Sequence, residues 1–185
     1  MHRDAGPPGA GIALAPPTHD RNGGTGGKAG RRIETTAWEA TGSEDADATS
    51  AQIHRGGCLC GRIRYRIAGA PLRSSLCHCR TCRKIASAPT LPFVVFPAGS
   101  LVFEGDSPQS FASSEHVVRT FCGTCGSPLI YATTTDPQTV DVMTVSLDNP
   151  EAYPPQNHVW VSEKLGWDVI ADNLPQHPRG LPDKD

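Results

Sequence analysis

The seven cysteines are the residues whose type and spacing most clearly indicate chemistry in this sequence. They form three clusters, Cys58-Leu59-Cys60, Cys77-His78-Cys79-Arg80-Thr81-Cys82 and Cys122-Gly123-Thr124-Cys125-Gly126. Disulfides are disfavoured because the number is odd, the spacing within a cluster is too tight for a bridge, and no secretory segment is recognised. A thioredoxin-like redox pair is disfavoured because no βαβ pattern surrounds these cysteines.

Zinc binding explains the clusters better than either redox role. Zn²⁺ takes four thiolate or imidazole ligands at tetrahedral angles, and a CxxC turn followed by Gly lets backbone amides point at the sulfurs. A CxC pair and a CxxC pair from distant parts of the chain would complete one closed site. The CxCxxC cluster would then hold a zinc with an open position, where chemistry takes place. The spacing also allows a second grouping, in which a ribbon-like site of Cys79, Cys82, Cys122 and Cys125 leaves Cys58, Cys60 and Cys77 over.

Other ionisable residues give weaker signals. His78 lies between two cysteines, so in an extended segment its side chain points away from a shared metal. We expect it to support the ligands or to lie at the surface, and we expect His116 and His158 to be structural residues of strands. Glu115 and Asp141 have no partner carboxylate at a spacing typical of acid–base catalysis. The basic residues near the cysteines are interpreted as solvated surface charges that could also help to hold an anionic thiol: Arg62, Arg64, Arg66, Arg80, Arg83 and Lys84.

The elements that must position these residues are predicted to be short β-strands. From His54 onward, segments with period-2 alternation or β-branched runs are closed by Gly, Pro, Asp or Asn. In residues 61–67, Ile63, Tyr65 and Ile67 share one face and arginines the other, which predicts one buried and one solvated face. Further strands are predicted at 91–96, 100–104, 116–121, 128–132 and 140–147, around Val159, and at 167–170. Short helical turns are predicted at 80–85 and 148–153, because no long helical period exists.

Length and composition limit the remaining possibilities. The chain has 185 residues, with 19 Gly, 17 Pro and only 6% aromatic residues, which favours one domain with a small core that bound metal would stabilise. The net charge of -2 gives no basic field for nucleic acid, and no run of 18 apolar residues predicts a membrane span. We therefore expect a cytoplasmic protein with neither kind of partner.

The composition also changes along the chain. Residues 1–50 are rich in Gly, Pro and Ala and have no periodic apolar pattern, so they are predicted to be a disordered tail. A zinc-binding domain is predicted over 54–174, followed by a second tail over 175–185.

Four segments resemble the glutathione-dependent formaldehyde-activating enzyme family, which is shared with centromere protein V. They are Gly56-Gly57-Cys58-Leu59-Cys60-Gly61, the run from Cys77 to Lys84, Phe121-Cys122-Gly123-Thr124-Cys125-Gly126-Ser127 and Ser146-Leu147-Asp148-Asn149-Pro150. The closing segment from His158 to Trp167, with Asp172-Asn173-Leu174-Pro175, is also similar to that family. The chain departs from the family pattern at Ser87, where many members have Gly, and at Thr90, where they have Phe.

The resemblance implies a mainly β architecture, the β-tent fold of antiparallel strands and hairpins around zinc. It also implies two zinc ions per chain. A structural zinc would be held by Cys58, Cys60, Cys122 and Cys125, and a second, catalytic zinc by Cys77, Cys79 and Cys82.

The implied activity is that of a carbon–sulfur lyase of the S-(hydroxymethyl)glutathione synthase type. A small-molecule thiol such as glutathione would add to formaldehyde or a related small aldehyde at the open zinc, or the adduct would be cleaved in reverse. The alternative is a non-catalytic zinc module that binds a protein or a small anion.

Overall fold

The computed structural model describes residues 52–181, so the predicted disordered tail over 1–50 lies outside the described residues. Ten strands are the main secondary structure of the described unit. They are β1 (Ile53–Gly57), β2 (Ile63–Ala68), β3 (Arg73–Cys77), β4 (Leu91–Pro97), β5 (Val102–Gly105), β6 (Gln109–Ser114), β7 (Val117–Phe121), β8 (Pro128–Thr133), β9 (Thr139–Met143) and β10 (His158–Val159). The expected mainly β class is therefore confirmed.

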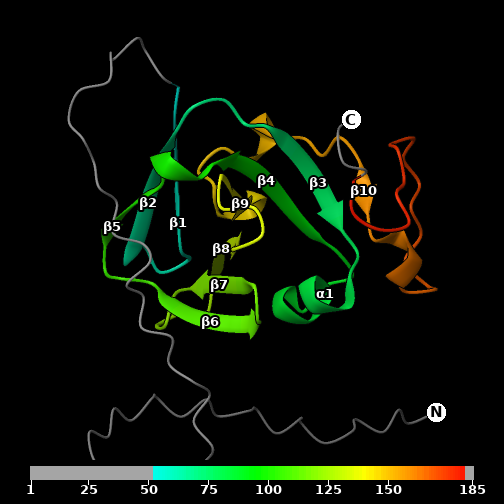
Figure 1. Cartoon of the computed structure of the whole chain (residues 1–185), viewed down its shortest axis with the longest axis horizontal. Coiled ribbons are helices and arrows are strands. Elements are labelled where there is room, and N and C mark those ends of the chain that lie inside the picture. The colour runs from blue at the N-terminus through cyan, green and yellow to red at the C-terminus, as the bar shows by residue number, and fades with distance from the viewer. Residues whose placement is uncertain (1–51, 182–185) are drawn as a thin grey trace, which may run out of the picture. The chain divides into compact units, whose positions relative to one another are not determined.

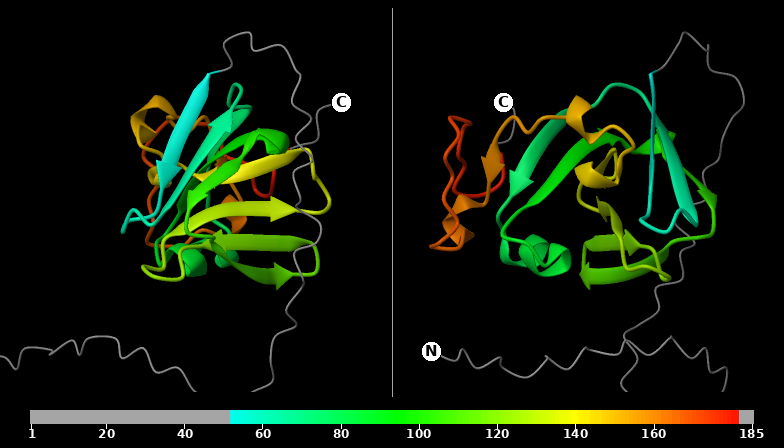
Figure 2. Two further views of the ribbon diagram at one scale, coloured as in Figure 1. Left: turned by 90° about the vertical axis from the view of Figure 1, so that its left-hand side faces the viewer. Right: turned by 180° about the vertical axis from the view of Figure 1, so that it is seen from behind.

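The strands form two sheets. The smaller sheet has the order β1-β2-β5, and the larger has the order β10-β3-β4-β9-β8-β7-β6. All neighbouring strands are antiparallel except β10 and β3, which are parallel. Figure 1 shows β1, β2 and β5 on one side of the unit and α1 and β10 on the opposite side. Figure 2 shows the same arrangement from two further directions.

The main hydrophobic core lies between the two sheets. Ile63, Tyr65 and Ile67 are each 1% exposed or less, which confirms the predicted inward face of β2. They belong to one cluster with residues of the larger sheet, including Phe96 of β4 and Val142 of β9. A second, smaller cluster lies at Cys77, Cys82, Leu91, Met143 and Val159. The three-cysteine segment is therefore part of a small apolar cluster of its own.

Helical structure is short, as predicted. The helix α1 (Arg80–Ala86) follows β3, and four 3-10 turns connect other elements: η1 (Ala98–Ser100), η2 (Thr144–Ser146), η3 (Pro150–Ala152) and η4 (Val161–Glu163). The side chain of Cys79 caps the N-terminus of α1 by accepting a hydrogen bond from the Cys82 amide. Ser87 ends the helix with φ 50°, the left-handed conformation that glycine adopts most readily. The departure from glycine at Ser87 therefore leaves a left-handed C-terminal cap in place.

Several strand predictions were wrong in detail. The predicted strand 140–147 ends at Met143, because the chain turns there into η2. No strand forms at 167–170, where Lys164 Nζ donates to the carbonyls of Leu165 and Asp168 and holds the segment as a loop. The strands β1, β3 and β6 were not in the set of predicted strands.

The described part of the expected C-terminal tail pairs with β10 and the turn after it. Residues His158 and Gln176 form an isolated parallel bridge, and the amide of Trp160 donates to the carbonyl of Arg179. Leu181 packs against the cluster around Cys77. Residues 175–181 thus belong to the packed unit. Among the described residues, no helix is long and apolar enough to cross a membrane.

Candidate metal centres and pocket

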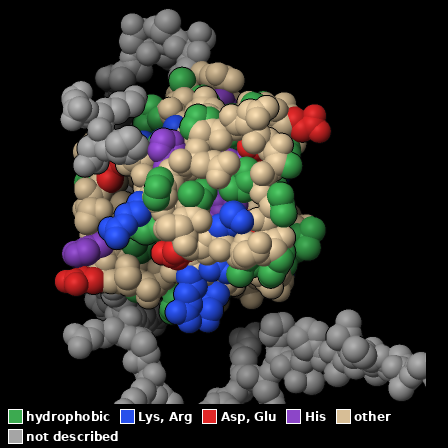
Figure 3. Space-filling view, turned by 90° about the vertical axis from the view of Figure 1, so that its right-hand side faces the viewer, with side chains coloured by type: hydrophobic (Ala, Val, Ile, Leu, Met, Phe, Trp, Pro, Cys, Tyr) green, Lys and Arg blue, Asp and Glu red, His purple; other side chains and the backbone are tan. Residues whose placement is uncertain are grey.

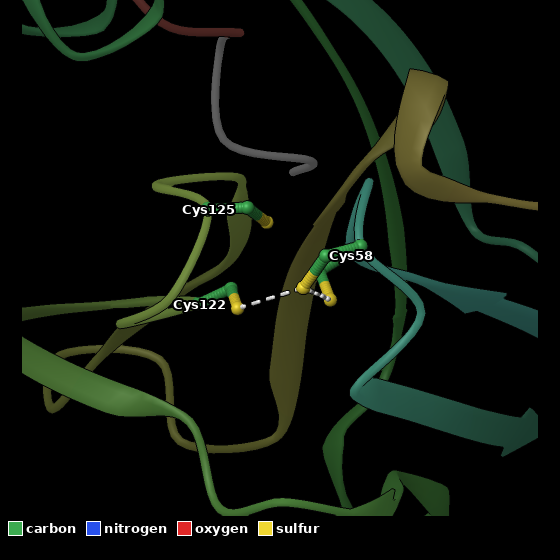
Figure 4. A group of neighbouring side chains, drawn as sticks. Cys58, Cys122 and Cys125 are labelled. Carbon is green, nitrogen blue, oxygen red and sulfur yellow. Dashed lines mark hydrogen bonds between the residues drawn. The ribbon is translucent and has the colours of Figure 1, made fainter. Parts of the chain in front are cut away.

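The first cysteine group, here called the four-cysteine cluster, comprises Cys58, Cys60, Cys122 and Cys125. Cys58 and Cys60 follow β1, and the other two lie in the loop between β7 and β8. Their four Sγ atoms lie within 4.8 Å of one another. The Sγ–Sγ distance is 3.5 Å from Cys58 to Cys60 and 3.8 Å from Cys60 to Cys122. Figure 4 shows Cys58, Cys122 and Cys125 pointing toward one another from these separate segments.

This donor set fits a tetrahedral zinc ion. A Zn–S distance of about 2.3 Å at tetrahedral angles places the sulfurs roughly 3.8 Å apart. The amide of Ile63 donates to Cys58 Sγ at 3.3 Å, which stabilises a thiolate. The Ser127 hydroxyl, 3.2 Å from Cys125 Sγ, is the main reason that the pKa of Cys125 falls to about 5. Gly126, with φ 77°, closes the turn by donating its amide to the Cys122 carbonyl.

The second group, here called the three-cysteine cluster, comprises Cys77, Cys79 and Cys82. Cys77 ends β3, Cys79 caps α1, and Cys82 lies within α1, so the start of a short helix brings the three sulfurs within 4.8 Å. A hydrogen bond with Cys77 is the largest cause that lowers the pKa of Cys79, and one with Cys82 adds to it. Hydrogen bonds within the same cluster act in the opposite direction on Cys77, whose pKa is raised mainly by Cys79 and also by Cys82. These residues fit a soft divalent metal with three protein ligands.

The structure thus brings together the seven cysteines in a group of four and a group of three. The alternative grouping of Cys79 and Cys82 with Cys122 and Cys125 is not found among residues 52–181. No disulfide joins any of the seven cysteines in this part of the chain.

A pocket of about 340 Å³ adjoins the three-cysteine cluster. All three cysteines line it, whereas no member of the four-cysteine cluster does. Its apolar wall comprises Leu91, Phe93, Val117, Met143, Val159 and Trp160, and its ionisable lining residues besides the cysteines are Arg119, Tyr131, Asp141 and Glu163. The volume is within the range of small-molecule sites.

Arg119 is a buried cation in this pocket, with 6% of its surface exposed. Its Nη2 donates to Cys82 Sγ at 3.7 Å, and its Nε donates to Ser113 Oγ at 3.3 Å. The guanidinium carbon lies 4.9 Å from the centre of the Tyr131 ring, a cation–π contact. No ion pair within the described residues includes Arg119. Its charge therefore faces the thiolates and the pocket.

A pair of histidines supports the other side of the three-cysteine cluster. His78 is 1% exposed, and its Nε2 lies 2.8 Å from His158 Nδ1. His158 Nε2 lies 3.0 Å from Asp172 Oδ2, and His78 Nδ1 lies 3.3 Å from Asp168 Oδ2. The pKa of His78 is lowered mainly by burial and to a smaller extent by the neighbouring His158. His78 is therefore a buried residue that ties the cysteine loop to the segment 158–172. The expectation that His116 is a structural residue of a strand was wrong, because it lies exposed in the turn between β6 and β7 and bonds to Thr134.

The basic residues noted in the sequence lie outside the pocket lining. Arg62, Arg64 and Arg66 form ion pairs with Asp106, Asp148 and Glu104 on the smaller sheet and its adjoining loops. Arg83 donates to the carbonyls of His78 and Glu163, and Arg80 and Lys84 are exposed. On the face seen in Figure 3, the largest group of Lys and Arg side chains lies at the lower edge of the coloured surface, and smaller groups lie at its left and near its middle.

Sequence reasoning missed the polar row Arg119, Tyr131 and Asp141. These residues lie directly opposite one another on β7, β8 and β9, so their side chains share one face of the larger sheet. The available signal was a lone charge inside an otherwise β-branched or apolar strand, as in Val117-Val118-Arg119 and Val140-Asp141-Val142. Glu115, the other carboxylate noted in the sequence, is exposed in the turn between β6 and β7.

Comparison with known proteins gives three similarities. Residues 53–163 match the family model of the glutathione-dependent formaldehyde-activating enzyme. An uncharacterized lyase of Schizosaccharomyces pombe is 36% identical over 81 residues, which are 44% of this chain and 58% of that protein. A crystal structure of a Rhodobacter sphaeroides protein is 18% identical, with a TM-score of 0.44 over 51% of this chain and 87% of that one. The match to the family model spans more than half of this chain. The chain therefore belongs to the glutathione-dependent formaldehyde-activating enzyme family.

Proposed function

We propose that this protein is a zinc-dependent carbon–sulfur lyase-like enzyme that adds a thiol such as glutathione to formaldehyde or a related small aldehyde, or catalyses the reverse. The observation that carries the proposal is that the three-cysteine cluster opens into a pocket, whereas the four-cysteine cluster is a complete ligand set outside it. Family membership and the lyase name of the yeast relative support an enzyme of this kind.

The donor sets support two zinc ions with different roles. Four thiolates close a structural site, and three thiolates leave one position for a further ligand. Zinc at the three-cysteine cluster would lower the pKa of a thiol ligand and so keep the substrate sulfur as thiolate. Three thiolates and Zn²⁺ carry a net negative charge, which suits a soft sulfur ligand better than activated water. We therefore favour thiol addition over hydrolysis.

The residues of the chain supply the remaining requirements. Arg119 offsets the negative charge of the cysteines through its hydrogen bond to Cys82. The apolar wall, with Leu91, Phe93 and Met143, limits the water around a small aldehyde. Seven cysteines that form no disulfide with one another suit a reducing compartment such as the cytoplasm. We assign this activity to the predicted domain over 54–174, with residues 175–181 packed onto it.

The experiment is an NMR measurement of the interconversion of ¹³C-formaldehyde, glutathione and their S-hydroxymethyl adduct. The wild-type protein should raise the interconversion rate above the spontaneous rate, and Cys79→Ser should remove the acceleration while leaving the four-cysteine cluster intact. Equal rates with and without wild-type protein would refute the enzyme. Tight glutathione binding without acceleration would instead favour a non-catalytic binding module.

A further inference from the structure

Asp141 is a carboxyl group facing the candidate active pocket from the middle of the larger sheet. It lies in β9 opposite Tyr131 of β8 and Val95 of β4. Tyr131 is in turn opposite Arg119, which touches Cys82. The same row of side chains therefore runs from the three-cysteine cluster to the Asp141 carboxyl along one face of the sheet.

Apart from Asp141 and the cysteines, three ionisable side chains line the pocket, those of Glu163, Tyr131 and Arg119. Glu163 Oε2 accepts a hydrogen bond from the Arg80 amide at 2.7 Å, which engages this carboxylate. Burial raises the pKa of Tyr131, so its hydroxyl stays protonated, and Arg119 stays a cation. Among residues 52–181, no ion pair engages Asp141, whereas its neighbour Asp136 accepts a hydrogen bond from the Thr139 hydroxyl. Asp141 is therefore the available carboxyl.

The surroundings of Asp141 also make both of its protonation states accessible. Burial raises its pKa to about 7, with Asp136 adding to the rise, while Arg73 and Arg119 oppose it. The charged groups that act on Asp141 lie on both sides of β9: Arg73 on β3, Arg119 on β7 and Asp136 in the β8–β9 connection. The two residues directly opposite Asp141 are uncharged, Tyr131 on β8 and Val95 on β4. A general acid–base group works best when its pKa is close to the working pH.

We propose that Asp141 is the acid–base residue that carries the proton between the substrate thiol and the hydroxyl group of the adduct. The inference rests on the proposed function and adds to it a residue role. In the forward direction the Asp141 carboxylate takes the proton of the thiol, and the sulfur electron pair forms the C–S bond with the aldehyde carbon. The C=O π electrons move to oxygen, and the Asp141 carboxyl returns the proton there.

The reverse reaction uses the same group. The carboxylate takes the hydroxyl proton of the adduct, the C=O bond re-forms, and the C–S electron pair leaves with sulfur, which regains the proton. No proton is gained or lost overall, and nothing is oxidised or reduced. Both directions start from the carboxylate, so the rate should fall as pH decreases through about 7.

The test compares wild type with Asp141→Asn, Asp141→Glu and the control Asp106→Asn, whose carboxylate pairs with Arg62 at the surface. With glutathione and ¹³C-formaldehyde, Asp141→Asn should lower kcat/KM by about 10²- to 10⁴-fold and remove the decline below pH 7. Asp141→Glu should keep part of the rate and Asp106→Asn all of it. Zinc content and circular dichroism show whether each variant folds.

A second readout needs no turnover. In protein labelled with ¹³C at the aspartate carboxyls, one resonance should titrate with a midpoint of about 7 and be missing in Asp141→Asn. Calorimetry in buffers of different ionisation enthalpy should also show that glutathione binding at pH 8 releases more protons from Asp141→Asn than from wild type.

The outcomes separate the two proposals. No acceleration by the wild-type protein overturns the proposed function. Acceleration by Asp141→Asn equal to that by wild type, with the same pH profile and the same proton release, overturns only the role of Asp141.

Discussion

Replacing Arg119 by methionine should weaken metal binding at the three-cysteine cluster and leave the four-cysteine cluster unchanged. The side chain is 6% exposed and donates to Cys82 Sγ, so it faces the ligands from within the protein. Three thiolates with one divalent ion carry a charge of −1, which the guanidinium offsets. Methionine fills a similar volume without this charge or hydrogen bond.

The expected magnitude comes from the hydrogen bond between the guanidinium and the Cys82 thiolate. A hydrogen bond to a charged group contributes about 1.5–3 kcal/mol, and about 1.4 kcal/mol corresponds to a tenfold change in a binding constant. We therefore expect the affinity for zinc to fall by roughly 10- to 100-fold, which is also typical when a partner of a metal ligand is removed. Arg119→Lys keeps the charge but not the planar fork that reaches both Cys82 and Ser113, so the fall in affinity should be smaller.

The assay is competition for zinc against a chromophoric chelator. Two binding steps should be resolved in the wild-type protein, a tighter one at the four-cysteine cluster and a weaker one at the three-cysteine cluster. Only the affinity of the weaker step should fall in Arg119→Met. The four-cysteine cluster is an internal control for folding, and Arg62→Met, at an exposed ion pair, is the matched control for removal of an arginine. An unchanged affinity at both steps in Arg119→Met would refute the reasoning.

Four further predictions concern stability. Cys122→Ser should abolish the cooperative thermal transition, because a structural zinc contributes on the order of 10 kcal/mol, and a transition like that of wild type would contradict this. Ser87→Gly should raise the melting temperature by roughly 2–4 °C, because the left-handed φ of 50° costs serine more than glycine; an unchanged value would argue against strain at this cap. His158→Gln should lower the free energy of unfolding in urea by about 1–3 kcal/mol, because buried His78 loses its partner, and no decrease would contradict the role of this pair. The raised pKa of Asp141 means that the folded state binds more protons than the unfolded state between pH 3.8 and about 7, so this group lowers stability as pH rises through that window. Asp141→Asn should therefore gain more stability over wild type at pH 8 than at pH 5 in urea unfolding, and an equal difference at both values would contradict this.

The parts of the fold that local pattern determines could be predicted from the sequence. The alternation at Ile63, Tyr65 and Ile67 reflects one buried and one solvated face, and β2 has this property. By contrast, β3 buries Ser74 and Ser75, and β6 is an edge strand with mostly exposed residues, so neither shows the apolar alternation expected of a strand.

Tertiary contacts decided the segments where the predictions were wrong. The β-branched pattern continues past Met143, yet the chain turns into η2, where Ser146 Oγ donates to the Met143 carbonyl and contacts the Tyr65 hydroxyl. The apolar residues Trp167 and Val169 are 70% and 79% exposed and have no neighbouring strand, among the described residues, with which to pair. Such choices depend on partners distant in the sequence.

The candidate site, like the fold, could be predicted from the sequence only in part. Sequence spacing showed which cysteines could act as ligands, because each of the CxC, CxCxxC and CxxC motifs is local, but spacing alone allowed more than one grouping of these motifs. The pocket residues Arg119 and Asp141 come together only through the register of β7, β8 and β9, and that register is a property of the whole sheet. Without that register, the two residues are isolated charges in separate strands.

The most direct test of the central claim is a ¹¹³Cd NMR spectrum of cadmium-substituted protein before and after glutathione is added. The account predicts two resonances, one from the closed four-cysteine cluster and one from the open three-cysteine cluster, and only the second should shift on binding. Cys79→Ser should remove the shifting resonance and keep the other. A single resonance, or two resonances of which neither shifts when glutathione is added, would contradict an open thiol-binding metal site.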